Sequence, residues 1–154
     1  MSPRHRKFPK TVSVLLNHKV VCIKADTRLS CAVEQMDKAG VSSVVVTDDE
    51  RPIGIFTERE LVAVIAEHSD FEALRICEKM SCPVITAPKT LDIREACHVL
   101  LEHRVRRLVV VDEHGAIAGI VTESDMIERL DLEDFVRYKG VDDVMSRHVI
   151  TCRA

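Results

Sequence analysis

The sequence is poor in several residue types whose scarcity excludes common classes of protein. Its 154 residues include no Trp, one Tyr and four Phe, so few aromatic rings are available to stack on nucleic-acid bases. Five Gly and five Pro are too few for a fibre or a low-complexity chain, and 46% apolar with 31% charged residues is typical of an ordered globular protein. The length leaves room for one compact domain or two half-size units.

Long apolar runs and an excess of one charge are missing as well. No run approaches the roughly 18 apolar residues that cross a bilayer, and residues 1–7 lack the apolar stretch of a secretory signal peptide. The 22 basic and 25 acidic residues give a net charge of −3, which provides no field for holding nucleic acid or an anionic membrane. We therefore expect a cytoplasmic protein with no membrane span and no nucleic-acid partner, and a basic N-terminal tail over residues 1–10.

The cysteines form no recognisable metal-binding or disulfide pattern. None stands in a C-x-x-C pair, and four lie among apolar residues, so we interpret them as reduced core residues in a reducing compartment. Cys97, His98 and His103 would share one helix, where residues i and i+1 point to different faces, so no metal site is predicted. The six cysteines are Cys22, Cys31, Cys77, Cys82, Cys97 and Cys152.

The chain contains an internal duplication. Residues 44–49 correspond to residues 108–113 at an offset of 64, and residues 54–60 correspond to residues 119–125 at an offset of 65. One residue has therefore been inserted between these blocks, where polar, turn-forming stretches separate apolar runs. A hairpin turn tolerates such a change of length, so we place the insertion in a hairpin.

The order of hydrophobic patterns is the same in both copies. A short apolar strand (20–23; 84–86) precedes a helix with apolar residues at i, i+3, i+4 and i+7, then two apolar strands (44–46 and 53–56; 108–111 and 117–121) and a second helix. The unbroken apolar strands predict sheets covered on both faces. The core face of the second helix is predicted to be Leu61, Val64 and Ile65 in the first copy and Met126, Ile127 and Leu130 in the second.

These patterns divide the chain into five segments. A basic tail (1–10) precedes the first repeat (11–68), a connecting helix (69–79) and the second repeat (80–131). Residues 80–86 reappear as residues 145–151, so segment 132–154 is predicted to hold a C-terminal helix and the start of a third copy, truncated from a longer protein. Each repeat alone would bury little apolar surface, so we expect an α/β (α+β) fold in which two β-α-β-β-α units pack together.

The junction between the last strand and the last helix of each copy is the most favourable place for ligand chemistry. The first N–H groups of a helix lack intrahelical partners and attract hydroxyl or phosphate oxygens. Thr122 could exchange a hydrogen bond with a ligand there, and the Asp125 carboxylate could accept from two vicinal ribose hydroxyls. The alternative is that T-x-x-D, like the stretch from Thr57 to Glu60, is only a helix-capping box.

Cations accompany that junction in the second copy only. Arg104, Arg106 and Arg107 precede the strand 108–111, and arginine can hold phosphate through paired hydrogen bonds. The first copy has Ser42 and Ser43 in the corresponding stretch, which supply no cation. The alternative for the arginines is a solvated basic turn paired with nearby carboxylates.

Taken together, these motifs resemble a tandem pair of CBS domains, the Bateman module. The resemblance covers about residues 10–131 and rests on the repeated β-α-β-β-α order and on residues 80–86, 104–112 and 119–125. It implies a regulatory, non-enzymatic module in which two repeats pack sheet to sheet about a pseudo-twofold axis. It also implies a homodimer with clefts that bind AMP, ADP or ATP as a regulatory ligand rather than as a required cofactor.

The resemblance implies site residues by motif position. Thr122 and Asp125 would hold the ribose, Ile85 and Val105 would flank the adenine, and Arg106 with Arg107 would face the phosphates. In the cleft of the first repeat the equivalents are Val21, Val41, Ser42, Thr57 and Glu60. Glu60 stands where the family has Asp, so this cleft is expected to bind nucleotide more weakly.

Two other functions stay open. In a ligand-free dimerisation scaffold the threonines and carboxylates of the junctions would serve only as helix caps, and a sensor of S-adenosylmethionine would need no phosphate site. An enzyme is not predicted, because no nucleophile and base occur together at a recognisable turn. We expect the signal of ligand binding to reach an effector domain beyond residue 154, as in signal transduction.

Overall fold

The two copies fold into two α+β units of the same design. The computed structural model describes residues 11–129, 146 and 150. The first unit contains β1 (Cys22–Lys24), α1 (Leu29–Ala39), β2 (Ser43–Asp48), β3 (Arg51–Thr57) and α2 (Glu58–Ala66). The second contains β4 (Thr86–Pro88), α3 (Ile93–His103), β5 (Arg107–Val111), β6 (Ile117–Thr122) and α4 (Glu123–Arg129). The predicted order of elements is confirmed in both units.

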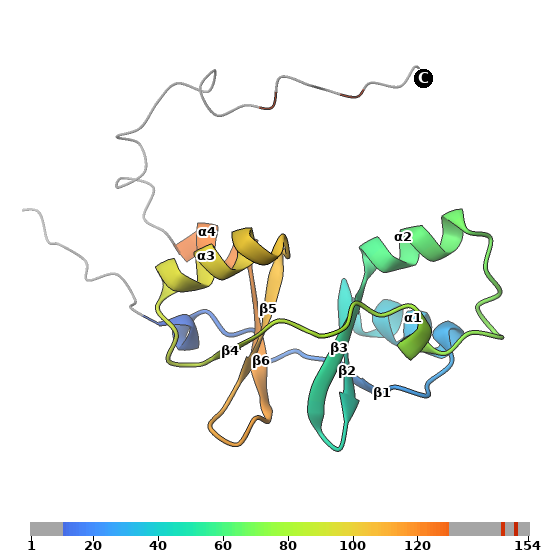
Figure 1. Ribbon diagram of the computed structural model, residues 1–154, viewed down its shortest axis with the longest axis horizontal. Helices are drawn as coiled ribbons and strands as arrows, with labels where there is room; N and C mark the ends of the chain where they lie inside the picture. Colours follow the sequence, from blue (N-terminus) through green and yellow to red (C-terminus); the bar gives the residue numbers. More distant parts are fainter. Residues whose placement is uncertain (1–10, 130–145, 147–149, 151–154) are drawn as a thin grey trace, which may run out of the picture.

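Each unit contains one three-stranded sheet with the same topology. β1 pairs in parallel with β2, which pairs antiparallel with β3, and β4, β5 and β6 repeat this arrangement. In Figure 1 both hairpins, β2–β3 and β5–β6, point to the bottom of the view, while α2, α3 and α4 lie at the upper end. The insertion lies in the hairpin connection, as predicted: residues 49–50 join β2 to β3, whereas residues 112–116 join β5 to β6.

The middle strand of each sheet is buried on both faces because alternate residues face different layers. In β2, Val44 and Val46 pack in the core between the sheet and its own helices, whereas Val45 faces the other sheet. In β5 the alternation is the same, with Val109 facing the first sheet. The predicted two-sided coverage of the strands is therefore confirmed.

The two sheets pack against each other through a shared apolar layer. Val45, Val109 and Ile120 are its buried centre, and Ile55 and Ile117 are partly buried beside them. Removing this surface from water stabilises the paired arrangement. The predicted packing of sheet on sheet about a pseudo-twofold axis is confirmed.

The segment before the first unit packs against the second unit. Val12, in the 3-10 helix η1 (Val12–Val14), and Leu15 lie in the core of the second unit and are 0% and 5% exposed. The Asn17 N–H donates to the Ile120 carbonyl at 2.9 Å and the reverse bond measures 3.0 Å, so this segment extends the sheet beyond β6. Figure 1 shows the segment running from the second unit across to β1.

The segment before the second unit makes the equivalent contacts with the first unit. Ile76, in the 3-10 helix η2 (Ile76–Glu78), is fully buried in the core of the first unit. Ser81 and Ile55 exchange backbone hydrogen bonds of 2.8 and 3.0 Å at the edge of β3. The connection predicted to be helical over residues 69–79 therefore holds one 3-10 turn, because its backbone is bonded to the first unit. This exchange of segments ties the two units together.

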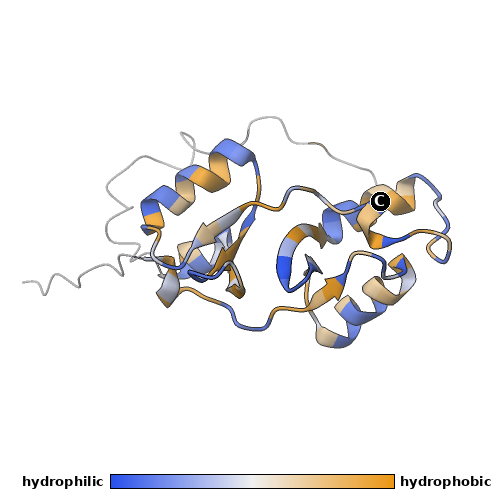
Figure 2. Cartoon of the chain, turned by 60° about the horizontal axis from the view of Figure 1, so that its bottom comes forward, coloured by the Kyte–Doolittle hydropathy of each residue, from blue (hydrophilic) through white to orange (hydrophobic). Residues whose placement is uncertain are grey.

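The helices are amphipathic, as the mixed colours along each of them show (Figure 2). Val64 of α2 and Met126 of α4 are buried as predicted. Ile65 and Ile127 are 57% and 62% exposed, so their assignment to the core is wrong. Each directly follows a buried residue and points about 100° away from it around the helix, toward the side that the core leaves open to water. The remaining predicted core residue of α4, Leu130, lies outside the described residues.

Most of the cysteines are not core residues, which corrects the prediction. Cys22, Cys31, Cys77 and Cys82 are exposed and Cys97 is half-buried. Their apolar neighbours in sequence occupy the core instead, as in β1, where Cys22 alternates with the buried Ile23. Cys152, the tail over 1–10 and most of the segment 132–154, with its predicted helix and third copy, lie outside the described residues.

Candidate ligand site at the strand-to-helix junctions

In the second repeat, the predicted ligand residues meet at the end of the sheet where β5 begins and β6 ends. Arg107 pairs with Thr122 across these strands. An N–H of β5 donates to the Ile85 carbonyl at 3.2 Å, and the first N–H of α4 donates to the Arg106 carbonyl at 3.1 Å. These contacts join the entry to β4, the start of β5 and the start of α4 in one place, which is called the second-repeat junction below.

The first repeat builds the equivalent place, the first-repeat junction. Ser43 pairs with Thr57 across β2 and β3. An N–H of β2 donates to the Val21 carbonyl at 2.9 Å, and the first N–H of α2 donates to the Ser42 carbonyl at 3.2 Å. The two junctions thus share one backbone design and differ in their side chains.

At the second-repeat junction, Thr122 and Asp125 form a capping box. Asp125 Oδ2 accepts from the Thr122 N–H at 2.8 Å and from its hydroxyl at 2.7 Å, and Thr122 Oγ1 lies 3.2 Å from the Asp125 nitrogen. Among the residues that the structure describes, Asp125 Oδ1 has no hydrogen-bond partner. One oxygen of the carboxylate is therefore used by the helix cap and the other can accept from a ligand.

At the first-repeat junction, the corresponding carboxylate is more heavily engaged. Glu60 Oε2 accepts from the Thr57 N–H at 2.9 Å and also from the Thr57 hydroxyl. Glu60 Oε1 accepts from the hydroxyl of Ser81, which lies in the segment exchanged between the repeats, at 2.9 Å. Both oxygens of Glu60 are thus already bonded within the protein.

Half-buried aliphatic side chains lie beside both junctions. Ile85 and Val105 pack against the core of the second unit, and Val21 and Val41 pack against that of the first. Each leaves part of its apolar surface open to contact with a flat ring. Their position on either side of an adenine base stays a prediction.

Arg106 faces solvent at the second-repeat junction. Its side chain is 82% exposed, and its Nε lies 3.5 Å from Glu123 Oε2. An exposed ion pair of this kind contributes little to stability. Turning the guanidinium from Glu123 toward an anionic ligand would therefore cost little.

Arg107 lies differently from the expectation that it faces phosphates beside Arg106. Its side chain crosses to the first repeat, where Nη1 donates to Ser42 Oγ at 3.1 Å. Burial lowers the pKa of Arg107 and Arg106 lowers it further, whereas Glu58 and Glu60 of the first repeat raise it. Within the described part of the chain, no carboxylate forms an ion pair with this half-buried guanidinium.

Three polar residues at the junctions are not among the predicted site residues. Ser81 bonds to Glu60, Glu123 lies beside Arg106, and Glu58 lies in the field of Arg107. The sequence does carry a signal for each of them. Ser81 belongs to the repeated Met-Ser pair, and both glutamates follow the threonine of the repeated capping motif.

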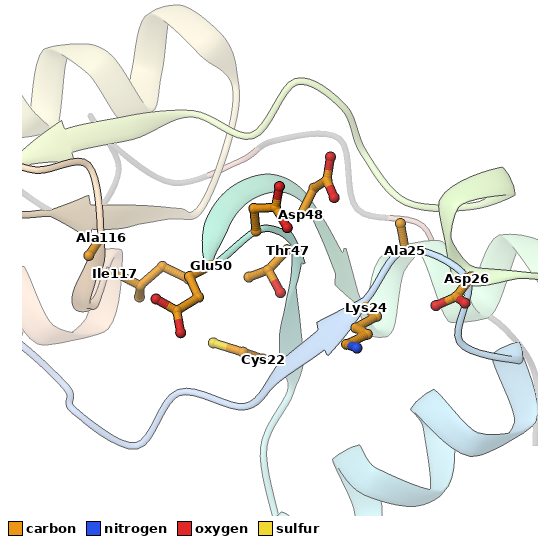
Figure 3. Close-up of a pocket in the computed structure, with 10 residues that line it drawn as sticks. Cys22, Lys24, Ala25, Asp26, Thr47, Asp48, Glu50, Ala116 and Ile117 are labelled. Carbon is orange, nitrogen blue, oxygen red and sulfur yellow. The ribbon is translucent and has the colours of Figure 1, made fainter.

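A hollow of about 760 Å³ lies at the opposite, hairpin end of the sheets. Figure 3 shows the carboxylates of Asp26, Asp48 and Glu50 around it, with Lys24 from β1, and with part of the second repeat on one side. None of the predicted ligand residues lines it. Its excess of negative charge opposes the binding of phosphate groups.

The described part of the chain shows neither a metal-binding cluster nor a membrane-spanning helix. Over residues 11–129, 146 and 150, no group of three or more His, Cys, Asp and Glu side chains is arranged to hold a metal ion. The helices in the same residues are too short or too polar to span a membrane.

The CBS domain family model matches the chain twice, at residues 12–67 and 73–132. The two matched segments contain the two units of the fold. Inosine-5'-monophosphate dehydrogenase of Aquifex aeolicus is 34% identical over 110 residues, which cover 71% of this chain and 22% of the dehydrogenase. The chain spans half or less of the length of the first curated relatives that it matches.

Solved structures with the same architecture support the match. A crystal structure of an uncharacterised conserved protein from Pyrococcus horikoshii is 27% identical, with a TM-score of 0.71 over 79% of this chain and 92% of that chain. The cytosolic domain of the Mg²⁺ channel MgtE, solved in complex with ATP, is 22% identical, with a TM-score of 0.68 over 79% of this chain and 49% of that chain. At 22% identity the likeness to the channel domain shows the fold alone.

Proposed function

Because the chain belongs to the CBS-domain family and carries two such domains in tandem, we propose that it is a regulatory module that binds an adenosine-containing ligand, AMP, ADP or ATP, at the second-repeat junction. Binding would shift the packing of the two repeats, and an attached effector would respond to that shift. A ligand moves such an equilibrium only if it binds the two arrangements with different affinity.

The free oxygen of Asp125 is the observation that carries the proposal. Oδ2 is taken by the helix cap, while Oδ1 has no partner among residues 11–129. A carboxylate oxygen beside the start of a helix is suited to accept from a ribose hydroxyl. Glu60 has no such free oxygen, since Thr57 and Ser81 bond to both of its oxygens. The difference favours the second repeat over the first.

Charge at the second-repeat junction supports a phosphate-bearing ligand. The exposed guanidinium of Arg106 lies beside the first turn of α4, whose first N–H groups carry partial positive charge. The cytosolic domain of MgtE, part of which has this fold, was solved in complex with ATP, which supports testing adenine nucleotides. AMP, ADP and ATP are therefore the ligands to test first.

Isothermal titration calorimetry with AMP, ADP and ATP tests the proposal. We expect Asp125→Asn to weaken binding about tenfold or more, because it removes the charge from a hydrogen bond to the ribose. Asp92→Asn is the matched control. Asp92 caps α3 in the same repeat by accepting from the Arg94 N–H at 2.8 Å, but it lies at the other end of the sheet. Asp92→Asn should change the affinity less than twofold.

A melting assay provides a second measurement that does not rely on heat of binding. A ligand present at a hundred times its Kd stabilises the native protein by about 2.7 kcal/mol. Equal stabilisation of the wild type and Asp125→Asn would contradict the placement of the ribose at Asp125. No stabilisation by any adenosine-containing ligand would contradict the proposed function itself.

S-adenosylmethionine belongs in the same panel, because it shares the adenosine group and lacks phosphate. Arg106→Ala should weaken AMP binding several-fold and leave adenosine binding nearly unchanged if Arg106 contacts the phosphate. Tighter binding of S-adenosylmethionine than of any nucleotide would favour the sensor of that compound instead.

A dimerisation scaffold is the second candidate, favoured by apolar side chains that the helices leave exposed. Val62 and Ile65 on α2 are 64% and 57% exposed, and Leu101 and Ile127 on α3 and α4 are 72% and 62% exposed. Association of two copies through these helices would remove the exposed aliphatic side chains from water. We propose that this surface forms the homodimer, whether or not the module binds a ligand.

Light scattering coupled to size-exclusion chromatography tests the dimer. Ile65→Glu and Ile127→Glu should yield a folded monomer, because each places an unpaired charge in an apolar contact. Cys31→Ser, a change at another exposed helical position, is the control that should keep the dimer. A dimer that withstands both charged substitutions would contradict the assignment of this surface.

A further inference from the structure

Arg107 connects the two junctions physically. Its backbone lies directly opposite Thr122 in the β5–β6 pair, and opposite residues of antiparallel strands have Cβ atoms about 5 Å apart. Its guanidinium nevertheless lies in the first repeat, where it donates to Ser42 Oγ at 3.1 Å. An extended arginine side chain is longer than this Cβ separation, so rotation about its side-chain bonds can bring the guanidinium from Ser42 to the side of Thr122.

The guanidinium of Arg107 has more hydrogen-bond donors than its contact with Ser42 in the first repeat uses. It carries five N–H donors, and the hydroxyl of Ser42 is a neutral acceptor. Within the described residues no carboxylate forms an ion pair with Arg107, although Glu58 and Glu60 lie in its surroundings. A phosphate at the second-repeat junction would offer a charged, bidentate acceptor, which binds arginine more strongly than a hydroxyl does.

We propose that Ser42, a residue of the first repeat, sets how strongly the second-repeat junction prefers phosphate-bearing to phosphate-free adenosine ligands, because it holds Arg107 away from the phosphate. A phosphate that captures Arg107 must break the hydrogen bond to Ser42, so binding in one repeat releases a contact with the other. This inference rests on the proposed function, since it describes the specificity of the same site. Ser42 acts here as a positioning residue.

The test is calorimetry of the full chain with AMP and with adenosine, comparing the wild type, Ser42→Ala and Ser42→Thr. Ser42→Ala removes the competing acceptor, so the ratio of the adenosine Kd to the AMP Kd should rise about three- to tenfold. Ser42→Thr keeps a hydroxyl at the same place, so its ratio should equal that of the wild type. In the background Arg107→Ala, the substitution Ser42→Ala should no longer change the ratio, because the side chain through which it acts is gone.

Each outcome decides between the two proposals. A ratio that is raised in Ser42→Ala and equal to the wild-type value in Ser42→Thr supports the positioning role of Ser42. An unchanged or lowered ratio, in a protein whose binding is still weakened by Asp125→Asn, overturns the role of Ser42 and leaves the adenosine site in place. Failure of the wild type to bind adenosine, AMP, ADP or ATP overturns the adenosine site and the role of Ser42 together.

Discussion

Replacing Val12 by Ala tests the exchange of segments between the repeats. Val12 lies 0% exposed in the core of the second unit, although it precedes the first unit in sequence. The substitution removes two methyl groups, each worth about 0.8 kcal/mol of transfer free energy. A cavity that relaxes only in part adds to this loss. We therefore expect the free energy of unfolding to fall by roughly 1.5 to 2.5 kcal/mol.

Urea unfolding followed by circular dichroism measures the effect, with Val14→Ala as the matched control. Val14 belongs to the same 3-10 helix and makes the same chemical change, but it is 47% exposed, so its loss should stay within about 0.5 kcal/mol. Ile76→Val, at the equivalent position of the other exchanged segment, should cost about 1 kcal/mol. The dependence of the free energy on urea should not change, because the same surface unfolds in each variant.

Two results would refute the reasoning. Equal losses for Val12→Ala and Val14→Ala would mean that the segment around Val12 is not packed in the core. Two separate unfolding transitions, with Val12→Ala affecting neither, would mean that the exchanged segments do not join the units into one cooperative structure.

Three further predictions concern single positions. Gly119→Ala should destabilise the protein clearly, because the new Cβ would lie 2.9 Å from the carbonyl oxygen of Asn17; a free energy of unfolding equal to that of the wild type would contradict the close approach of these segments. Backbone N–H groups of the β5–β6 turn lower the pKa of Asp112. The stabilisation that Asp112 provides is therefore present above the pKa of the unfolded state and is lost as the pH falls through the lower pKa of the folded state. The difference in the free energy of unfolding between the wild type and Asp112→Asn should shrink on acidification, and a difference that does not change with pH would contradict this. Burial and Asp92 raise the pKa of the half-buried Cys97 thiol, so Cys97 should react with a thiol reagent at neutral pH more slowly than the exposed Cys31 in the native protein and equally fast in denaturant.

The local architecture could be predicted because it depends on short sequence patterns. The unbroken apolar run at 44–46 requires cover on both faces of its strand, and Val45 does face the other sheet while its neighbours face the helices. The hairpin position of the insertion follows from the same local logic. Patterns of this kind are set by neighbours within one or two turns of a helix or one strand.

The contacts between distant segments could not be predicted in the same way. Val12 and Ile76 stand in apolar stretches that fit a core, but hydrophobic periodicity does not say which repeat supplies that core. The direction of Arg107 depends on the neighbouring repeat for the same reason. Ile65 and Ile127 look like core residues because they are apolar, but apolarity alone does not separate a core position from an exposed one.

The sequence also could not predict that Asp125 Oδ1 has no hydrogen-bond partner among the described residues. The capping motif predicts both roles of Asp125, as a cap and as a ligand acceptor, and only its hydrogen-bond partners separate them. The contrast with Glu60 depends on Ser81, which reaches it from a segment 21 residues away in sequence.

Because the edge segments are exchanged between the repeats, cutting the chain between its repeats separates each sheet from a segment that pairs with it. A fragment that holds one repeat together with the stretch before it would carry the edge segment that pairs with the sheet of the other repeat. Two identical copies of such a fragment could trade these stretches and complete each other. The tandem chain is, in this respect, the covalently linked form of a domain-swapped pair. Circular permutation with new termini between the repeats would keep both edge-segment pairings, whereas dividing the chain into its two repeats would break both.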